Sequence, residues 1–241
     1  MKNFILERKN PAENHIFDIG RKFLASGQVL EFEGNTFISH LEQQGKHSEI
    51  FNRVLDLYRE LQYRDLSRKI VLLPPSSYHI TAFEGFNNLD RNDEAWPATI
   101  RRDLPIHILN NIILEKLKRN QRPETGPLCY HLNDDGLFFQ NNTLQIPLIT
   151  SDDNSHCKLL KLRDYLASVT GLRRPDHQLY KSHITIAYKK FSINRHEAEE
   201  VAYLINKWVK KIMSDRIEFQ VPKVTYCIFS DMFFFQELLD V

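Results

Sequence analysis

The chain has few cysteines and no long apolar run. Its 241 residues include three cysteines, Cys129, Cys157 and Cys227, which are widely separated and not arranged as CxxC. This pattern argues against a disulfide framework and against a zinc site built from cysteines. No stretch approaches the length of a membrane span, and the apolar run after Met1 is too short for a signal peptide. We therefore expect a cytoplasmic protein that contacts no membrane.

Net charge is also nearly absent. The sequence holds 32 Lys and Arg against 31 Asp and Glu, which gives a formal net charge of +1 at pH 7. Such a chain has no overall field that would attract long duplex nucleic acid or an anionic membrane. A nucleic-acid partner should therefore be small, such as a nucleotide or an RNA end, and we expect the protein to be a monomer.

Several motifs of known catalytic sites are missing. There is no GxGxxG or Walker sequence to hold a nucleotide cofactor, and no serine or cysteine lies in a nucleophile elbow. The ten histidines include no HExxH pair, and the chain lacks a carboxylate-rich ligand cluster. The sequence therefore predicts no cofactor and no catalytic metal.

One tripeptide, His-Ile-Thr, occurs twice, at residues 79–81 and 183–185. Both copies lie in stretches typical of strands, 77–83 and 182–188. Successive side chains on a strand point to opposite faces, so each His shares a face with the Thr two positions later. Two such strands brought together by internal symmetry would make one site with two imidazoles and two hydroxyls.

The rest of the chain supports such a duplication. After a polar, turn-rich N-terminal extension (residues 1–34), each half runs strand, helix, His-Ile-Thr strand and helix, with an offset of about 104 to 108 residues. Gly171 should end one helix, and Asn194 with Glu197 should open another as a capping box. We predict an α+β fold of one bilobal domain, residues 35–241, with lobes at about 35–125 and 126–241. We expect this fold to be a pseudo-twofold duplication with antiparallel sheets, flanking helices and a central cleft.

The predicted site suits acid–base chemistry at phosphorus. One of His79 and His183 would take a proton from the attacking hydroxyl or water, and the other would protonate the leaving oxygen. Thr81 and Thr185 would donate hydrogen bonds to non-bridging phosphate oxygens. Lys181 lies on the strand face of the second motif and is a candidate phosphate contact. The remaining candidate for substrate binding, Ser77, occupies the equivalent position before the first motif.

With its two H-x-[ST] motifs, His79-Ile80-Thr81 and His183-Ile184-Thr185, the chain resembles the 2H phosphoesterase superfamily, to which LigT-like proteins belong. The resemblance spans roughly residues 35–230. Within the superfamily, residues 34–41 and the preceding 27–30 are similar to an uncharacterised branch with a longer amino-terminal part. Known members act on 2′,3′-cyclic phosphates of RNA ends, ADP-ribose cyclic phosphate, 2′-5′ oligoadenylates or signalling cyclic oligonucleotides. The resemblance implies metal-independent phosphodiester chemistry and gives the catalytic roles to the two His and two Thr.

Two classes of function remain open at this point. The first is a phosphodiesterase acting on 2′,3′-cyclic or 2′-5′ bonds of RNA ends or small nucleotides. The second is a non-catalytic module that kept the cleft and binds nucleotides or RNA ends. Retention of all four motif residues favours the enzyme, because binding alone does not need two titratable groups. An RNA end-joining activity that runs the same chemistry in reverse is a minor alternative.

Overall fold

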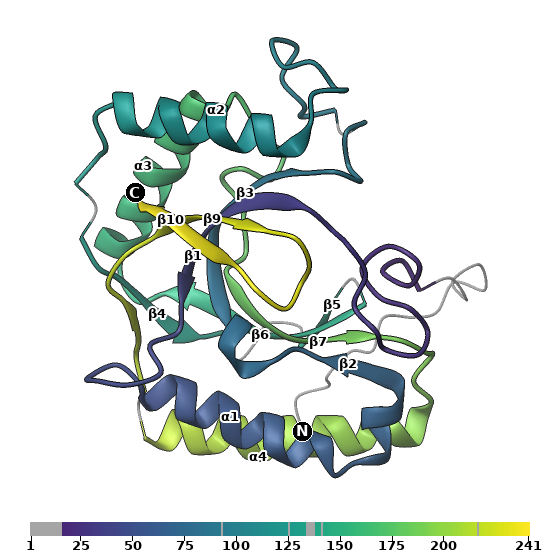
Figure 1. Ribbon diagram of the computed structural model, residues 1–241. Helices are drawn as coiled ribbons and strands as arrows, with labels where there is room; N and C mark the ends of the chain where they lie inside the picture. Colours follow the sequence, from purple (N-terminus) through teal and green to yellow (C-terminus); the bar gives the residue numbers. More distant parts are fainter. Residues whose placement is uncertain (1–15, 93, 125, 134–137, 141, 216) are drawn as a thin grey trace.

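The computed structural model describes residues 16–92, 94–124, 126–133, 138–140, 142–215 and 217–241. Two antiparallel sheets form its centre (Figure 1). The first has the strand order β10 (Gln236–Asp240), β9 (Thr225–Phe229), β1 (Gly34–His40) and β3 (His79–Asn87). The second has the order β2 (Ile70–Leu72), β7 (His183–Lys189), β6 (Thr143–Thr150), β4 (Leu128–Leu132) and β8 (Phe219–Val221), with β5 (Phe139–Gln140) paired to β6.

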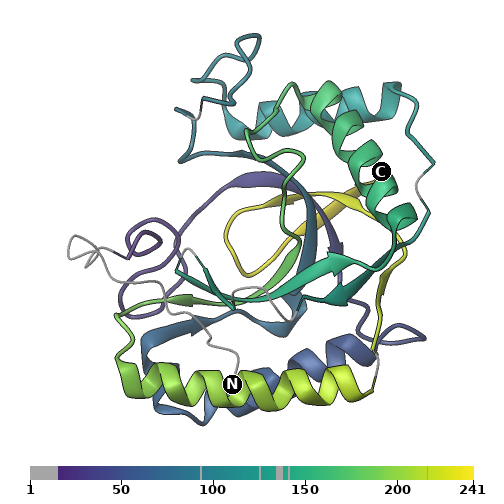
Figure 2. The same cartoon turned by 180° about the vertical axis from the view of Figure 1, so that it is seen from behind.

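Two pairs of helices cover the sheets on opposite sides, as Figures 1 and 2 show. One pair is α1 (Glu49–Gln62) and α4 (Arg195–Ser214), and the other is α2 (Ile106–Arg119) and α3 (Asp153–Thr170). Two short 3-10 turns, η1 (Asp65–Lys69) and η2 (Pro75–Ser77), precede β2 and β3. The predicted α+β architecture with antiparallel sheets, flanking helices and a cleft is confirmed.

The helix ends follow local rules that the sequence shows. The Asn194 side chain accepts a hydrogen bond from the Glu197 amide at 2.9 Å, and the Glu197 carboxylate accepts one from the Asn194 amide at 2.7 Å. This capping box satisfies two amides that have no partner within the helix. Gly171 ends α3 with φ +79°, a left-handed conformation that glycine adopts without strain. Both predicted helix ends are therefore confirmed.

The two His-Ile-Thr strands carry the same irregularity. In β3 the pairing with β1 shifts so that Ala82 is an extra residue, and in β7 the pairing with β6 shifts so that Ile186 is extra. Each extra residue lies three positions after the motif histidine. A bulge of this kind reverses the alternation of side chains beyond it. The internal symmetry therefore includes the backbone distortion as well as the motif.

Each sheet takes strands from both halves of the sequence. β9 pairs with β1, and β2 pairs with β7, although these partners lie far apart in the chain. The predicted lobe ranges, 35–125 and 126–241, therefore do not coincide with the two sheets. The strand β10 was not predicted, because its sequence, Gln236–Asp240, lacks the alternation of a half-buried strand.

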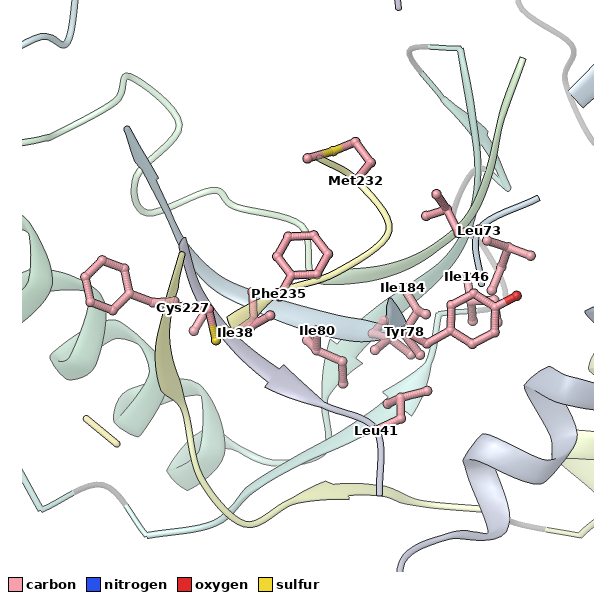
Figure 3. Close-up of a cluster of buried hydrophobic side chains, with 14 of the residues drawn as sticks. Ile38, Leu41, Leu73, Tyr78, Ile80, Ile146, Ile184, Cys227, Met232 and Phe235 are labelled. Carbon is pink, nitrogen blue, oxygen red and sulfur yellow. The ribbon is translucent and has the colours of Figure 1, made fainter. Parts of the chain in front are cut away.

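The core lies between the sheets and the helices, and the middle residue of each motif belongs to it. Ile80 and Ile184 are 1% and 0% exposed. In Figure 3 both lie among buried apolar side chains, and Phe235 lies on the other side of β3 from Ile80. Burial of these isoleucines fixes the register of both strands, because a slip by one residue would turn them to the opposite face.

The described part of the predicted N-terminal extension, residues 16–33, is packed against the sheets. Phe23 is fully buried and contacts the rings of Tyr188 and Phe233, with centroids 5.0 and 6.0 Å away. The Phe32 amide donates to the Ser230 carbonyl at 2.8 Å. This segment therefore contacts both β7 and the loop between β9 and β10. Residues 1–15 lie outside the described part of the chain.

Candidate active site

Both His-Ile-Thr motifs line one cleft with a volume of about 650 Å³. His79 and Thr81 come from β3, and His183 and Thr185 come from β7. Because the isoleucine of each motif is buried, strand alternation turns His and Thr toward the cleft. Lys181 lines the same cleft, so the structure brings together five of the six predicted site residues, and the cleft has the size of common ligand pockets.

Each motif histidine is held by a backbone carbonyl two residues earlier. The Nδ1 atom of His79 lies 2.7 Å from the Ser77 carbonyl oxygen, and that of His183 lies 2.9 Å from the Lys181 carbonyl oxygen. A carbonyl oxygen can only accept, so Nδ1 carries the proton in both rings. Proton exchange with a ligand must then take place at Nε2, which is the arrangement that a general acid or base needs.

His79 has a strongly perturbed pKa. Burial lowers it from 6.5 to about 4, the Ser77 carbonyl opposes this shift, and His40 and His183 add to it by charge repulsion. Phe235 packs against the His79 ring with centroids 4.5 Å apart, which contributes to this burial. His79 is therefore neutral at pH 7, the form in which an imidazole accepts a proton.

The other two predicted residues differ from each other. Lys181 lines the cleft beside His183. Ser77 is buried in the 3-10 turn before β3, and its hydroxyl donates to the Pro74 carbonyl at 2.8 Å. The predicted contact between the Ser77 side chain and substrate is not supported, because the turn interrupts the strand alternation on which that prediction was based. Its contribution is the carbonyl that holds His79.

The bulges bring two further side chains into the cleft, Glu84 and Tyr188. Each lies five positions after its motif histidine. Strict alternation would place Phe83 and Ala187 on the cleft face, but the extra residue in each strand moves the next side chain there. A bulge has no clear signal in a single sequence, so these two positions could not be predicted.

The backbone carbonyls of the two extra residues, Ala82 and Ile186, both accept hydrogen bonds. The Leu73 amide donates to the Ile186 carbonyl at 2.9 Å. The Arg163 guanidinium donates to the Ala82 carbonyl at 2.5 Å and to the His177 carbonyl at 2.9 Å. Arg163 is 4% exposed, so helix α3 provides a buried cation that fixes β3 next to Thr81. The sequence did not indicate this role, because a lone arginine on a helix usually lies at the surface.

Tyr180 links the two motifs from the segment that precedes β7. Its hydroxyl hydrogen-bonds to the Thr81 side chain, and its ring lies 6.2 Å from the His183 ring, between centroids. The Arg163 guanidinium lies 4.5 Å from the centre of the same ring. The orientation of Thr81 therefore depends on the second half of the chain.

The N-terminal segment also contributes to the cleft, through Asp18 and Lys22. Their side chains form an ion pair with an Nζ to Oδ1 distance of 3.1 Å, and Lys22 also hydrogen-bonds to Tyr188. Burial lowers the pKa of Lys22, but Tyr188 and Asp18 outweigh it and raise the pKa above its ordinary value. Lys22 therefore stays charged at neutral pH.

Within the described residues, no group of three or more His, Cys, Asp or Glu side chains is arranged to hold a metal ion. No described helix is both long enough and apolar enough to cross a membrane.

Comparison with known proteins bears on this site. Residues 22–130 match the model of a family described as 2H-phosphodiest, a domain of unknown function (DUF1868). The structure is similar to that of a conserved protein of unknown function from Agrobacterium tumefaciens, at 22% identity and a TM-score of 0.81, over 92% of this chain and 91% of that chain. The two proteins therefore share a fold. No curated protein gives a significant match.

Weaker structural similarities connect the chain to two further proteins. Escherichia coli LigT in its apo form is 13% identical with a TM-score of 0.44, over 88% of this chain and 98% of that chain. A protein described as a phosphoesterase is 12% identical with a TM-score of 0.46, over the same shares of the two chains.

The family match includes the first motif, and the second motif lies in the same cleft. Over residues 22–130 the chain is therefore similar to a family described as 2H-phosphodiest.

Proposed function

We propose that the protein is a phosphodiesterase that cleaves 2′,3′-cyclic or 2′-5′ phosphodiester bonds of small nucleotides or RNA ends without a metal ion. The observation that carries this proposal is the pair of motif histidines, each with Nδ1 held by a carbonyl, in one cleft with two motif threonines. A binding module would need cations and hydroxyls but not two such histidines.

The protons can be followed through the proposed reaction. Neutral His79 takes a proton from water at Nε2 while the water oxygen bonds to phosphorus. The bond from phosphorus to the leaving ribose oxygen breaks, and His183 gives that oxygen a proton from its Nε2. Thr81, Thr185 and Lys181 donate hydrogen bonds to the non-bridging oxygens as negative charge increases there. A proton transfer from His79 back to His183 through solvent completes the cycle.

A substrate panel tests the proposal. It contains nucleoside 2′,3′-cyclic phosphates, 2′-5′ and 3′-5′ dinucleotides and ADP-ribose cyclic phosphate, with products separated by chromatography. We expect turnover of a cyclic or 2′-5′ substrate that is unchanged by EDTA, because two histidines perform both proton transfers. Loss of activity in EDTA that one divalent ion restores would contradict the metal-independent mechanism. Tight binding of these nucleotides without turnover would support the binding module.

The low pKa of His79 predicts an unusual pH profile. The base must be neutral, so kcat/KM should not decline as pH falls through 6.5 and should decline only near pH 4. Phe235→Ala would open the ring of His79 to water and raise its pKa, which would move the acidic limb to higher pH. Phe234→Ala is the matched control, because Phe234 is 68% exposed. An acidic limb near pH 6.5 in the unmodified protein would contradict this role for His79.

A further inference from the structure

The centre of the cleft is symmetric, but its flanks are not. The positions five residues after each motif histidine hold Glu84 on β3 and Tyr188 on β7. Each faces a threonine on the neighbouring strand, since Glu84 pairs with Thr36 and Tyr188 pairs with Thr143. The two motifs present the same residue types to the phosphodiester, whereas the two ends of a substrate meet different side chains at these flanking positions.

The charges along the cleft limit which charged groups the two ends of a substrate can have. Among the described lining residues, four carboxylates (Asp18, Glu84, Asp90 and Asp176) accompany three Lys and Arg side chains (Lys22, Arg174 and Lys181), and Asp90 is paired with Arg21 at 2.7 Å. A site for several phosphates shows the opposite balance, because each phosphate needs cations or other donors. The cleft as described is therefore unsuited to a substrate with more than one phosphate group.

Ion pairs already engage two of these three cations. The Nζ atom of Lys22 lies 3.1 Å from Asp18, and the Nε atom of Arg174 lies 3.4 Å from the Glu84 carboxylate. No ion pair between described residues involves Lys181, which lies beside His183. The cationic charge available to a ligand therefore matches one phosphodiester, and it lies where the proposed chemistry takes place.

Glu84 has a carboxylate suited to the neutral part of a substrate. Its side chain is 53% exposed, so it keeps oxygen atoms for a ligand in addition to the contact with Arg174. A carboxylate accepts hydrogen bonds from sugar hydroxyls and base amino groups and repels phosphate. The equivalent Tyr188 has no charge, so this preference applies to the β3 side of the cleft.

From these observations, and resting on the proposed function, we infer that the cleft selects phosphodiesters with a single negative charge. Nucleoside cyclic phosphates and dinucleoside monophosphates without a terminal phosphate are of this class. Glu84 is the residue that determines this specificity, because it contacts hydroxyl or amino groups of the substrate and rejects a second phosphate.

The test compares adenosine 2′,3′-cyclic phosphate with the same nucleotide bearing a 5′-phosphate. We expect kcat/KM to favour the compound without the 5′-phosphate by about 10- to 100-fold, because like charges in a partly desolvated site repel. Glu84→Gln keeps the size of the side chain and removes its charge. It should reduce this preference by about 5- to 10-fold, chiefly by lowering KM for the 5′-phosphorylated compound.

Glu115→Gln is the matched control, because it removes the same charge from an exposed residue on α2. Equal kcat/KM values for the two compounds, a preference for the 5′-phosphorylated one, or equal effects of the two variants would overturn the inference.

A binding measurement separates this inference from the proposed function. If no compound of the substrate panel is turned over, the proposed function fails, and titration calorimetry with adenosine 2′-monophosphate and adenosine 2′,5′-bisphosphate still tests the cleft. Weaker binding of the bisphosphate, with the difference reduced in Glu84→Gln, would support the inference. Binding of the bisphosphate as tightly as the monophosphate would overturn it.

Discussion

Replacing either motif histidine with alanine should lower kcat/KM by about 10² to 10⁴, the usual contribution of a general acid or base. His79→Ala removes the group that accepts the proton of water, and His183→Ala removes the group that protonates the leaving oxygen. The double variant should be little worse than either single one, since both groups act in one concerted step and their effects are not additive. Thr81→Ala and Thr185→Ala should cost less, partly through substrate affinity.

The measurement is steady-state kinetics on the best substrate of the panel, with folding checked by circular dichroism. His107→Ala is the matched control, because His107 is an exposed histidine on α2 that does not line the cleft. Near-normal turnover by His79→Ala or His183→Ala would refute acid–base catalysis by the pair and would favour the binding module.

The second large effect should come from a residue that does not line the cleft. Arg163→Met would leave the buried carbonyls of Ala82 and His177 without their donor, and each such loss costs about 1 to 3 kcal/mol. We therefore expect the free energy of unfolding to fall by about 2 to 5 kcal/mol. The bulge at Ala82 would also lose its anchor, so kcat/KM should decrease at temperatures where the variant is still folded.

Urea denaturation followed by fluorescence measures the change in stability. Lys161→Met on the exposed face of the same helix makes a similar change in charge and side-chain shape without touching a buried carbonyl. If the two variants were equally stable and equally active, Arg163 would have no part in holding β3.

Local patterns were sufficient to predict many elements of this fold. The capping box at Asn194 and the helix end at Gly171 depend on residues close in sequence, and both occur as predicted. The repeated His-Ile-Thr tripeptide was equally informative, because a strand with one buried isoleucine must turn the flanking His and Thr to the other face. Strand alternation and the repeat were therefore enough to predict a common cleft for the motif residues.

What the sequence did not show depends on contacts between distant segments. The bulges that turn Glu84 and Tyr188 into the cleft arise from pairing with β1 and β6. Arg163 acts on a strand 81 residues earlier, and Lys22 comes from a segment with no strand or helix pattern. The prediction for the Ser77 side chain failed for a local reason. Pro74 and Pro75 begin a turn before β3, but the predicted strand was extended back over this turn.

The exchange of strands between the two halves has a consequence for how the protein is made. β1 takes β9 as its neighbour, although β9 and β10 come after all the other described strands in the sequence. Pairing over such a separation is slow, because the chain loses the entropy of closing a long loop before the strands form any stabilising contact. Phe235, which covers His79, arrives with the same hairpin. The first histidine therefore acquires its low pKa only after β9 and β10 have been synthesised and paired, so a nascent chain contains the first motif before His79 has its buried environment.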